Sequence, residues 1–349
     1  MVYPWSYLRQ TALAPGQALM PSVSVIVPCY NEAGTIRSLL GAVAGQTYPA
    51  DEVEVVIADA LSTDGTREEI DAFKAGQDTP EVRVIDNPMR AIPIGLNLAL
   101  AGARAETIVR LDAHCIPYPD YIERCLAALE SGFGDNVGGV WEIKPSGLGW
   151  IARSIAAAAA HPLGAGDARY RSGTAPGEVD TVPFGAYRKS LVEGLGGYDE
   201  SLLTNEDYEL NVRIRKSGGR IWIDPAIRSI YFARSSFRAL ARQYWRYGFW
   251  KARMLLKHPD TIRWRQLSPL LVLSLGILAL LSPWFNPARI LFFIEALVYS
   301  AALLVSGIQT SRREHRVALV LGVPLAIGTM HFAWGTAFLW SLFLSLLRK

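Results

Sequence analysis

The chain has 349 residues, of which 50% are hydrophobic and 19% charged, and its formal net charge is only +3. This mild charge, without a basic stripe carrying interleaved aromatic residues, argues against a nucleic acid-binding protein. The mean hydropathy of +0.18 is high for a soluble enzyme. Long apolar runs are confined to residues 266–347, whereas residues 1–265 have a globular composition. We therefore expect a globular part followed by a membrane region.

The cysteines and the N-terminus indicate the compartment of the globular part. Cys29, Cys115 and Cys125 are an odd number without CxxC spacing, which argues against a disulfide framework or a structural zinc site. The first twenty residues lack the basic-then-apolar build of a signal peptide. We expect residues 1–20 to be an N-terminal extension and the globular part to stay in the cytosol.

The first half of the globular part alternates between strand-like and helix-like patterns. Apolar runs predict buried strands at 23–27, 53–58, 81–88 and 106–115. Helical spacing of apolar residues follows the first strands, and the second helix is expected to begin near Thr66. This alternation predicts an α/β fold with a mostly parallel sheet and helices on both faces.

The pattern changes after about residue 137. Strand-like segments lie at 138–143 and 220–232, and helical patterns lie at 150–164, 204–218 and 236–258. The last of these helices is basic and aromatic and leads into the apolar region. We therefore expect an α/β domain at 21–236, an amphipathic interfacial helix with a linker at 237–265, and a membrane region at 266–349.

Three apolar segments approach the roughly 20 residues that a spanning helix needs, at 267–284, 288–308 and 317–346. The first only just reaches this length. Pro324 and His331 interrupt the third, which is expected to tilt, kink or partly re-enter. The basic residues beside these segments favour the cytoplasmic face of a membrane, and they are Arg263, Arg265, Arg312, Arg313 and Arg316. A multi-pass anchor is expected.

The stretch VRLDAHCIPYPDYI at 109–122 combines a carboxylate with an imidazole at the end of an apolar run. Its two prolines are expected to end the strand, and positions i and i+2 of an extended segment lie on one face. Asp112 and His114 are therefore expected to point at one ligand. Ligands of open parallel sheets bind beyond the carboxyl ends of the strands. We interpret the pair as a metal site, although a lone histidine is more often a core residue.

Two other polar segments fall at the same predicted edge. PCYNE (28–32) follows the first strand, and Asp59 ends the second strand before STDGT (62–66). An acidic residue at the end of the second strand commonly binds ribose hydroxyls. The alternatives are helix capping by the Asn-Glu pair and plain turn chemistry at Asp64-Gly65. Neither GxGxxG nor GxxxxGK[ST] occurs, which argues against a dinucleotide fingerprint and a Walker loop.

TNEDYEL (204–210) places Glu206 and Asp207 side by side near a helix start. Thr204-x-x-Asp207 also fits a capping box, which is the alternative interpretation. Adjacent acids on a helix diverge by roughly 100°, so one general base is a better interpretation than a facing pair of carboxylates.

QYWRYGFWK (243–251) lies in the basic, aromatic helix. An interfacial helix with its aromatic and basic residues at the headgroups explains most of this composition. This interpretation gives no reason for the spacing of Gln243 and Arg246, which lie about one helical turn apart.

In order and approximate spacing, VSVIVPCYNE, IADALSTDGT, LDAHC, TNEDYEL and QYWRY resemble the motifs of the large inverting glycosyltransferase family, family 2, with a GT-A fold. The likeness extends to bacterial exopolysaccharide enzymes of the succinoglycan-glucosyltransferase type, which carry a C-terminal membrane segment. It is strong over residues 21–260. The resemblance implies a GT-A, Rossmann-like sheet in the catalytic domain, followed by C-terminal transmembrane helices.

The resemblance implies a nucleotide-sugar site at the sheet edge. Pro28, Tyr30 and Glu32 match the PxYNE element that lines this site. Asp59 matches the aspartate that contacts the nucleobase. Asp112 matches the first position of the DxD element, beside the ribose and the diphosphate.

His114 stands where the second aspartate of the DxD element is usual, so the resemblance makes Asp112 and His114 the metal ligands. An imidazole beside carboxylate and phosphate oxygens accepts Mn²⁺ better than Ca²⁺, and Mg²⁺ is an alternative. The expected cofactor is therefore Mn²⁺ or Mg²⁺.

The remaining matches concern the reaction itself. Asp207 matches the catalytic base, with Glu206 beside it. Gln243 and Arg246 match a QxxRW element at the acceptor or diphosphate, with Tyr247 in place of its tryptophan.

The resemblance implies a membrane-anchored inverting glycosyltransferase with a UDP-sugar as the expected donor and a lipid-linked saccharide as the acceptor. It would act at a bacterial-type inner membrane in exopolysaccharide or cell-surface glycan synthesis. Two other enzyme classes are alternatives. A processive synthase would share these motifs but usually needs more membrane helices. A polyprenyl-phosphate sugar synthase is closer, but its acceptor is a phosphate, which needs little help from a general base. A non-catalytic, membrane-tethered sugar-nucleotide sensor is a third alternative, although it has no need of Asp112, His114 and Asp207 together.

Overall fold

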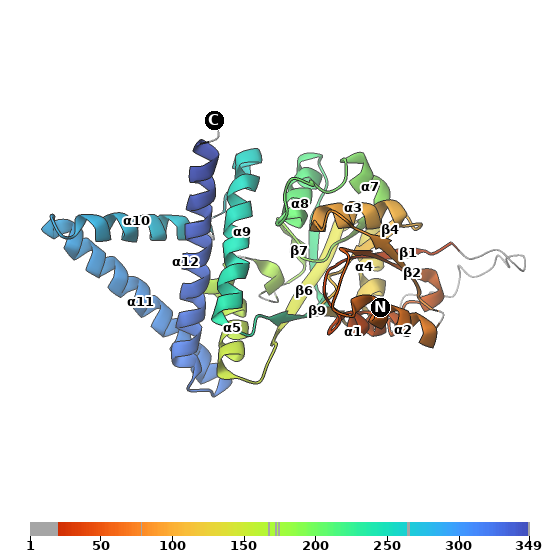
Figure 1. Ribbon diagram of the computed structural model, residues 1–349, viewed down its shortest axis with the longest axis horizontal. Coiled ribbons are helices and arrows are strands. Elements are labelled where there is room, and N and C mark those ends of the chain that lie inside the picture. The colour runs from red at the N-terminus through yellow and green to blue at the C-terminus, as the bar shows by residue number, and fades with distance from the viewer. Residues whose placement is uncertain are drawn as a thin grey trace, which may run out of the picture.

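The structure is a computed structural model that describes residues 20–347 except 78, 167, 172, 174, 264 and 265. Residues 1–19 of the predicted N-terminal extension, and Arg265, lie outside the described residues. The α/β domain occupies one end of the molecule and the C-terminal helices the other (Figure 1).

A central sheet forms the α/β domain. Strands β1 (Val23–Cys29), β2 (Val53–Asp59), β3 (Glu81–Asp86) and β4 (Thr107–Arg110) are parallel and lie in the order β3-β2-β1-β4. Within the described residues the whole sheet has nine strands. β2 is buried along its full length and β1 almost so, as their apolar runs predict. The predicted parallel arrangement of these four strands is confirmed.

Helices cover both faces of this parallel part, and they are α1 (Ile36–Ala44), α2 (Thr66–Gly76) and α3 (Ile92–Gly102). Alternate residues of β1 join two hydrophobic cores. Val25 packs in the core under α1, and Ile26 packs in the core under α3. The start of α2 at Thr66 is as predicted.

Further strands complete the sheet, namely β5 (Cys115–Pro117), β6 (Asn136–Pro145), β7 (Gly177–Glu178), β8 (Ala186–Arg188) and β9 (Ile221–Ala233). β8 pairs antiparallel with β4 and β6, β6 is parallel to β9, and β5 and β7 pair antiparallel with β9. The predicted fourth strand at 106–115 is divided in the structure, because β4 ends at Arg110 before the prolines, and a separate strand, β5, ends at Pro117. β5 is at the end of the strand order, where the missing N–H of a proline is tolerated.

Shorter helices and turns fill the connections: α4 (Tyr121–Glu130), α5 (Trp150–Ala160), α6 (Pro162–Ala165), α7 (Lys189–Gly194), α8 (Glu206–Lys216), η2 (Ala50–Glu52), η3 (Arg169–Arg171) and η4 (Pro259–Thr261). α5 and α8 fall within the predicted helical patterns. The strand-like segment predicted at 220–232 forms one strand, β9.

The helices that follow are α9 (Phe237–Lys257), α10 (Ser268–Leu281), α11 (Asn286–Glu314) and α12 (Leu319–Leu346). In the described part of the chain, two helices, α11 and α12, are long and apolar enough to cross a membrane. α10 has 14 residues, and at about 1.5 Å per residue such a helix falls short of a hydrocarbon core of about 30 Å. The expected three-span, multi-pass anchor is therefore not supported.

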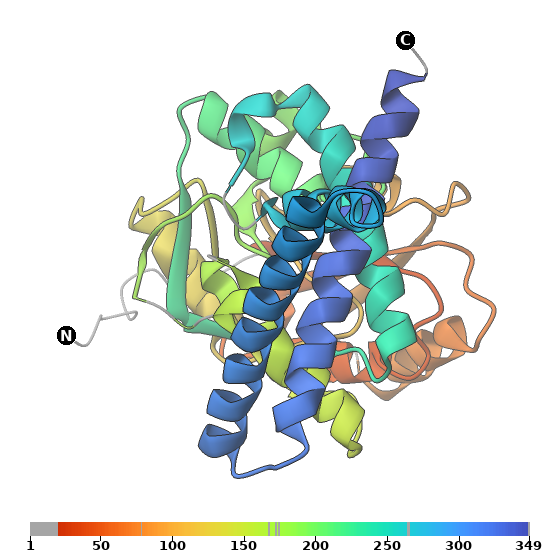
Figure 2. The same cartoon turned by 90° about the vertical axis from the view of Figure 1, so that its left-hand side faces the viewer.

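α12 packs along α9 and does not project away from the α/β domain (Figures 1 and 2). Gly248 allows this approach, because a Cβ there would lie 2.1 Å from the carbonyl oxygen of Trp334. A Cβ at Gly322 would likewise lie 1.9 Å from the Oγ atom of Ser154 on α5. Because of these close approaches, α12 packs against both α5 and α9. The helix is continuous through Pro324.

This packing predicts the side of the membrane on which the turn between α11 and α12 lies. Because the start of α12 contacts α5, we expect Arg316→Cys and Glu69→Cys on α2 to face the same side. A membrane-impermeant maleimide should label both variants under the same permeabilisation conditions. The native cysteines are buried and should react little. Labelling of Arg316→Cys from the outer face of intact cells, without labelling of Glu69→Cys, would contradict this arrangement.

Candidate active site

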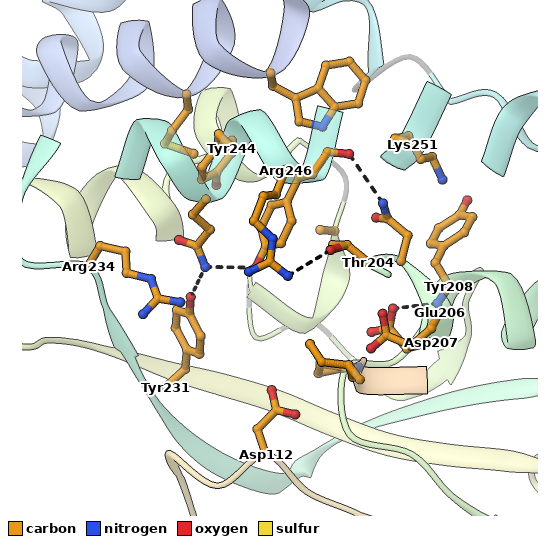
Figure 3. A pocket seen from close by; sticks show the side chains of 18 of the residues that line it. Asp112, Thr204, Glu206, Asp207, Tyr208, Tyr231, Arg234, Tyr244, Arg246 and Lys251 are labelled. Atoms are coloured by element: carbon orange, nitrogen blue, oxygen red, sulfur yellow. Dashed lines mark hydrogen bonds between the residues drawn. The ribbon is translucent and has the colours of Figure 1, made fainter. Parts of the chain in front are cut away.

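A cavity of about 1030 Å³ lies at the carboxyl ends of β1 and β4 and reaches the C-terminal helices (Figure 3). The sheet edge and the start of α8 contribute its acidic side chains. α9 contributes basic and amide side chains, and α10 and α12 contribute apolar side chains such as Leu271 and Trp334. A charged part and an apolar part therefore belong to one cavity.

Arg110, at the end of β4, joins the acidic residues of this cavity. Its Nη2 atom lies 2.9 Å from Asp112 Oδ1 and 3.4 Å from Glu206 Oε1. Its Nη1 atom donates to the carbonyl oxygen of Pro183 at 2.8 Å. Arg110 is only 6% exposed. A buried cation therefore holds two carboxylates from distant parts of the chain at one place.

Burial controls the protonation of Glu206 and Asp207. Loss of solvation raises the pKa of both carboxyl groups, while the nearby Arg110 charge opposes that increase. Asp207 Oδ1 also accepts a hydrogen bond from its neighbour, the backbone N–H of Tyr208, at 2.7 Å. A carboxylate with a raised pKa inside a cavity is suited to accept a proton near neutral pH.

The capping box, which was the alternative interpretation of this segment, does not form at the start of α8. Asn205 occupies the N-cap position with a left-handed φ of 69°, and its side chain makes no capping bond. Thr204 Oγ1 instead donates to the Leu203 carbonyl oxygen at 2.7 Å. The capping interpretation of Asp207 is therefore wrong. Its side chain lines the cavity with that of Glu206 (Figure 3).

Of the residues predicted to line the nucleotide-sugar site at the sheet edge, the structure places four in the cavity and one outside it. Pro28, Tyr30, Glu32 and Asp112 line the cavity together. Asp59 does not, because it is fully buried behind the edge. Its carboxylate accepts hydrogen bonds from Ser62 and Arg67. The structure therefore does not bring Asp59 to the cavity surface.

The two alternative interpretations at this edge were turn formation at Asp64-Gly65 and helix capping by Asn31-Glu32, and only the first is found in the structure. Asp64 accepts hydrogen bonds from the backbone N–H groups of Ala33 and Thr66, so the turn interpretation of Asp64-Gly65 is confirmed. The N-cap of α1 is Thr35. The Asn31-Glu32 pair therefore does not cap this helix, and the Glu32 side chain is available to the cavity.

His114 does not share a strand face with Asp112. β4 ends at Arg110, and both residues lie in the turn before β5. His114 Nδ1 lies 3.0 Å from Glu32 Oε1. Burial lowers the pKa of His114, but the Glu32 hydrogen bond and the Asp112 charge outweigh burial, and the net pKa is raised. Glu32 thus orients the ring in the way that a carboxylate orients a metal-binding histidine.

The residues present fit a metal that binds together with a diphosphate. Among the described residues no group of three His, Cys, Asp or Glu side chains is arranged to hold a metal alone. Mg²⁺ commonly binds through one or two protein carboxylates, with substrate phosphates and water as its other ligands. Asp112 and His114 are compatible with such a shared site.

Gln243, Arg246 and Tyr247 on α9 line the same cavity. Gln243 Nε2 donates to the hydroxyls of Tyr231 and Tyr247 at 2.9 Å each. Arg246 Nη2 donates to Thr204 Oγ1 at 3.3 Å, which joins α9 to the loop before Glu206 (Figure 3). The one-turn spacing of the glutamine and arginine is therefore a feature of the site, beyond the composition of an interfacial helix.

Arg171 also lines the cavity, and the sequence analysis singled out neither Arg110 nor Arg171. Arg110 offered a signal, because an arginine within a fully buried strand needs acidic partners. Arg171 lies in a polar loop segment without a recognisable motif, and the sequence gives no comparable signal for it.

The comparisons with known proteins agree with this geometry. A family model for Glycosyl transferase family 2 matches residues 24–196. The Succinoglycan biosynthesis protein ExoA of Rhizobium meliloti is 32% identical over 319 residues, covering 90% of this chain and 93% of that protein. The mannosyltransferase PcManGT from Pyrobaculum calidifontis, solved with GDP-Man and Mn²⁺, has a TM-score of 0.62 at 21% identity. This match covers 92% of this chain and 89% of PcManGT.

A more distant relative is the Dolichyl N-acetyl-alpha-D-glucosaminyl phosphate 3-beta-D-2,3-diacetamido-2,3-dideoxy-beta-D-glucuronosyltransferase of Methanococcus voltae. It is 24% identical, over 89% of this chain and 94% of that protein. The sheet topology and the likeness to PcManGT show a GT-A fold. The chain belongs to glycosyltransferase family 2.

Proposed function

We propose that the chain transfers a sugar from a nucleoside-diphosphate donor, expected to be a UDP-sugar, to a hydroxyl group of a lipid-linked saccharide. The main support is the buried Glu206 and the half-buried Asp207, which line the same cavity as Asp112 and whose pKa values are raised. The name of the Rhizobium relative refers to succinoglycan biosynthesis. The name of the Methanococcus relative refers to a dolichyl phosphate-linked sugar. The first name supports a role in exopolysaccharide synthesis, and the second supports an acceptor carried on lipid. The two candidate membrane helices support a reaction at an inner membrane, and we propose that the catalytic domain lies in the cytoplasm.

The reaction is a single inverting displacement. The Asp207 carboxylate accepts the proton of the acceptor hydroxyl while the hydroxyl oxygen forms a bond to the anomeric carbon. The bond from that carbon to the diphosphate oxygen breaks, and its electron pair leaves with the nucleoside diphosphate. One base suffices, so no covalent sugar–enzyme intermediate forms.

The leaving diphosphate needs positive charge. Arg246 lines the cavity and supplies a guanidinium for it. Asp112 and His114 would hold Mn²⁺ or Mg²⁺, which when bound neutralises charge on the diphosphate oxygens. Glu32 keeps the His114 ring oriented through its bond to Nδ1.

The apolar part of the cavity supports a membrane-held acceptor. Leu271 and Trp334 line this part. Trp245 on α9 is 41% exposed, which suits an aromatic residue at headgroup depth. Holding the acceptor in the plane of the membrane raises its effective concentration near Asp207.

Membranes containing the protein test this proposal. They should be incubated with a panel of radiolabelled nucleotide sugars and either a polyprenyl-diphosphate oligosaccharide or the same oligosaccharide released from lipid. We expect transfer to the lipid-linked form. Equal use of the free oligosaccharide at equal concentration would contradict the lipid-linked acceptor, and transfer to a bare polyprenyl phosphate would identify a polyprenyl-phosphate sugar synthase.

Metal removal gives a separate prediction. EDTA should abolish transfer, and Mn²⁺ or Mg²⁺ should restore it. Glu32→Gln should raise the metal concentration for half-maximal activity by about 10–100-fold, as is typical when a carboxylate that orients a metal-bound histidine is lost. His114→Ala should have at least the same effect, with little change in the melting temperature. Full activity in EDTA would rule out the metal site.

A further inference from the structure

Arg171 is held in an aromatic enclosure in the cavity wall. Its guanidinium carbon lies 5.4 Å from the ring centroids of both Trp141 and Tyr170. Its Nη1 atom donates to the Tyr244 hydroxyl on α9 at 3.1 Å. These contacts fix the position and orientation of the guanidinium before any ligand binds.

This guanidinium has few acceptors for its five N–H donors. Its Nε atom is buried without a hydrogen-bond partner in the part of the chain that the structure describes. Within the same part, no carboxylate forms an ion pair with Arg171, whereas the neighbouring cavity cation Arg110 has two. Aromatic faces offset only a fraction of the cost of burying a cation. The arrangement is therefore suited to binding an anion.

The surroundings of Arg171 indicate the kind of anion. The Arg171 segment follows α6, where the Leu163 carbonyl oxygen accepts a hydrogen bond from His331 Nε2 on α12 at 2.8 Å. Leu163, His331 and Arg171 all line the cavity. The hydrogen bond to Tyr244 holds the arginine against α9, in the same cavity as the apolar side chains Leu271 and Trp334 of α10 and α12. A ligand with an anionic head and an apolar tail matches both parts.

We propose that Arg171 binds a phosphate group of the lipid diphosphate that carries the acceptor saccharide. This inference rests on the proposed function and extends it to a second anion subsite, separate from the donor diphosphate beside Asp112 and Arg246. The planar fork of arginine matches two phosphate oxygens, and the bound phosphate supplies the acceptors that Nε and the remaining N–H groups lack.

Binding of farnesyl diphosphate and of farnesol to the full-length protein tests this subsite. UDP or GDP, whichever binds more tightly, is kept at saturation with Mn²⁺ so that the donor site is filled. The wild type should prefer farnesyl diphosphate by about 10–100-fold, as expected for hydrogen bonds to a charged group. Arg171→Met should reduce this preference to near unity without changing nucleotide affinity. Arg124→Met, which removes an exposed guanidinium on α4, is the matched control.

Arg171→Lys keeps the positive charge but loses the planar fork, so it should retain only part of the preference for farnesyl diphosphate. If Arg171→Met fails to fold, this variant tests the subsite in its place. An unchanged preference in both folded variants, or none in the wild type, would overturn the subsite. If the wild type transfers sugar to lipid acceptors while Arg171 has no effect, only the subsite fails. If the Arg171-dependent preference is found without any transfer, the subsite stands and the proposed function fails. Inorganic phosphate should not compete with farnesyl diphosphate at equal concentration, because it lacks the apolar tail.

Discussion

Asp207→Asn is expected to lower the rate of sugar transfer by about 10²–10⁴-fold, the usual contribution of a general base. Asparagine has nearly the same shape but no basic oxygen. Because Asp207 does not form the capping box, the substitution removes no helix cap and folding should be preserved. Turnover should be measured at saturating donor and acceptor, together with the melting temperature and donor affinity.

Asp120→Asn is the control for this variant, because Asp120 is a half-exposed acid at the N-cap position of α4 whose side chain makes no capping bond. It should have wild-type turnover. Near-normal turnover of Asp207→Asn would remove Asp207 from the mechanism. It would also favour an acceptor that needs little base, such as a polyprenyl phosphate.

Arg110→Met is expected to destabilise the fold by about 3–5 kcal/mol, the range found when one partner of a buried ion pair is removed. The change leaves Asp112 and Glu206 without their shared cation. Urea unfolding should measure the loss of stability. Arg124→Met removes an exposed ion pair and should cost no more than about 1 kcal/mol. Equal stability of these two variants would contradict the role of Arg110.

The same residues predict opposite shifts in the pH dependence of turnover. The Arg110 charge lowers the pKa of Asp207, so Arg110→Met should move the acid limb to higher pH. Asp112→Asn removes a like charge that raises the pKa of Asp207 and should move the acid limb to lower pH. In each case activity is lost as pH falls, because the base must be ionised. Shifts in the same direction for both variants would contradict the electrostatic account.

The parallel half of the sheet was predictable because each strand and helix there carries its own periodic signal. The runs before Asp59 and the apolar spacing in α1 are of this kind. The second half depends on long-range pairing. β8 inserts between β4 and β6, and a three-residue strand gives no periodic signal of its own.

The site was predicted in outline, and its geometry was not. The spacing of Asp112 and His114 suggested a common strand face, but the strand ends before them and Glu32, from another strand end, orients the imidazole. Asp59 was placed correctly at its strand end, yet Arg67 on α2 engages its carboxylate. Such partners come from tertiary packing, which a single sequence does not display.

The close approach of α12 to α5 and α9 has a consequence for how this protein diversifies. A C-terminal region joined only by a linker is modular, so different anchors are interchangeable without effect on chemistry. Here Gly248 and Gly322 bring the backbone of α12 against the catalytic domain, and Trp334 lines the cavity. Under the proposed function, attachment and acceptor choice are therefore inherited together. A chimera with another anchor is expected to lose one wall of the cavity, whereas exchange of the whole unit from α5 to α12 is expected to carry acceptor preference with it.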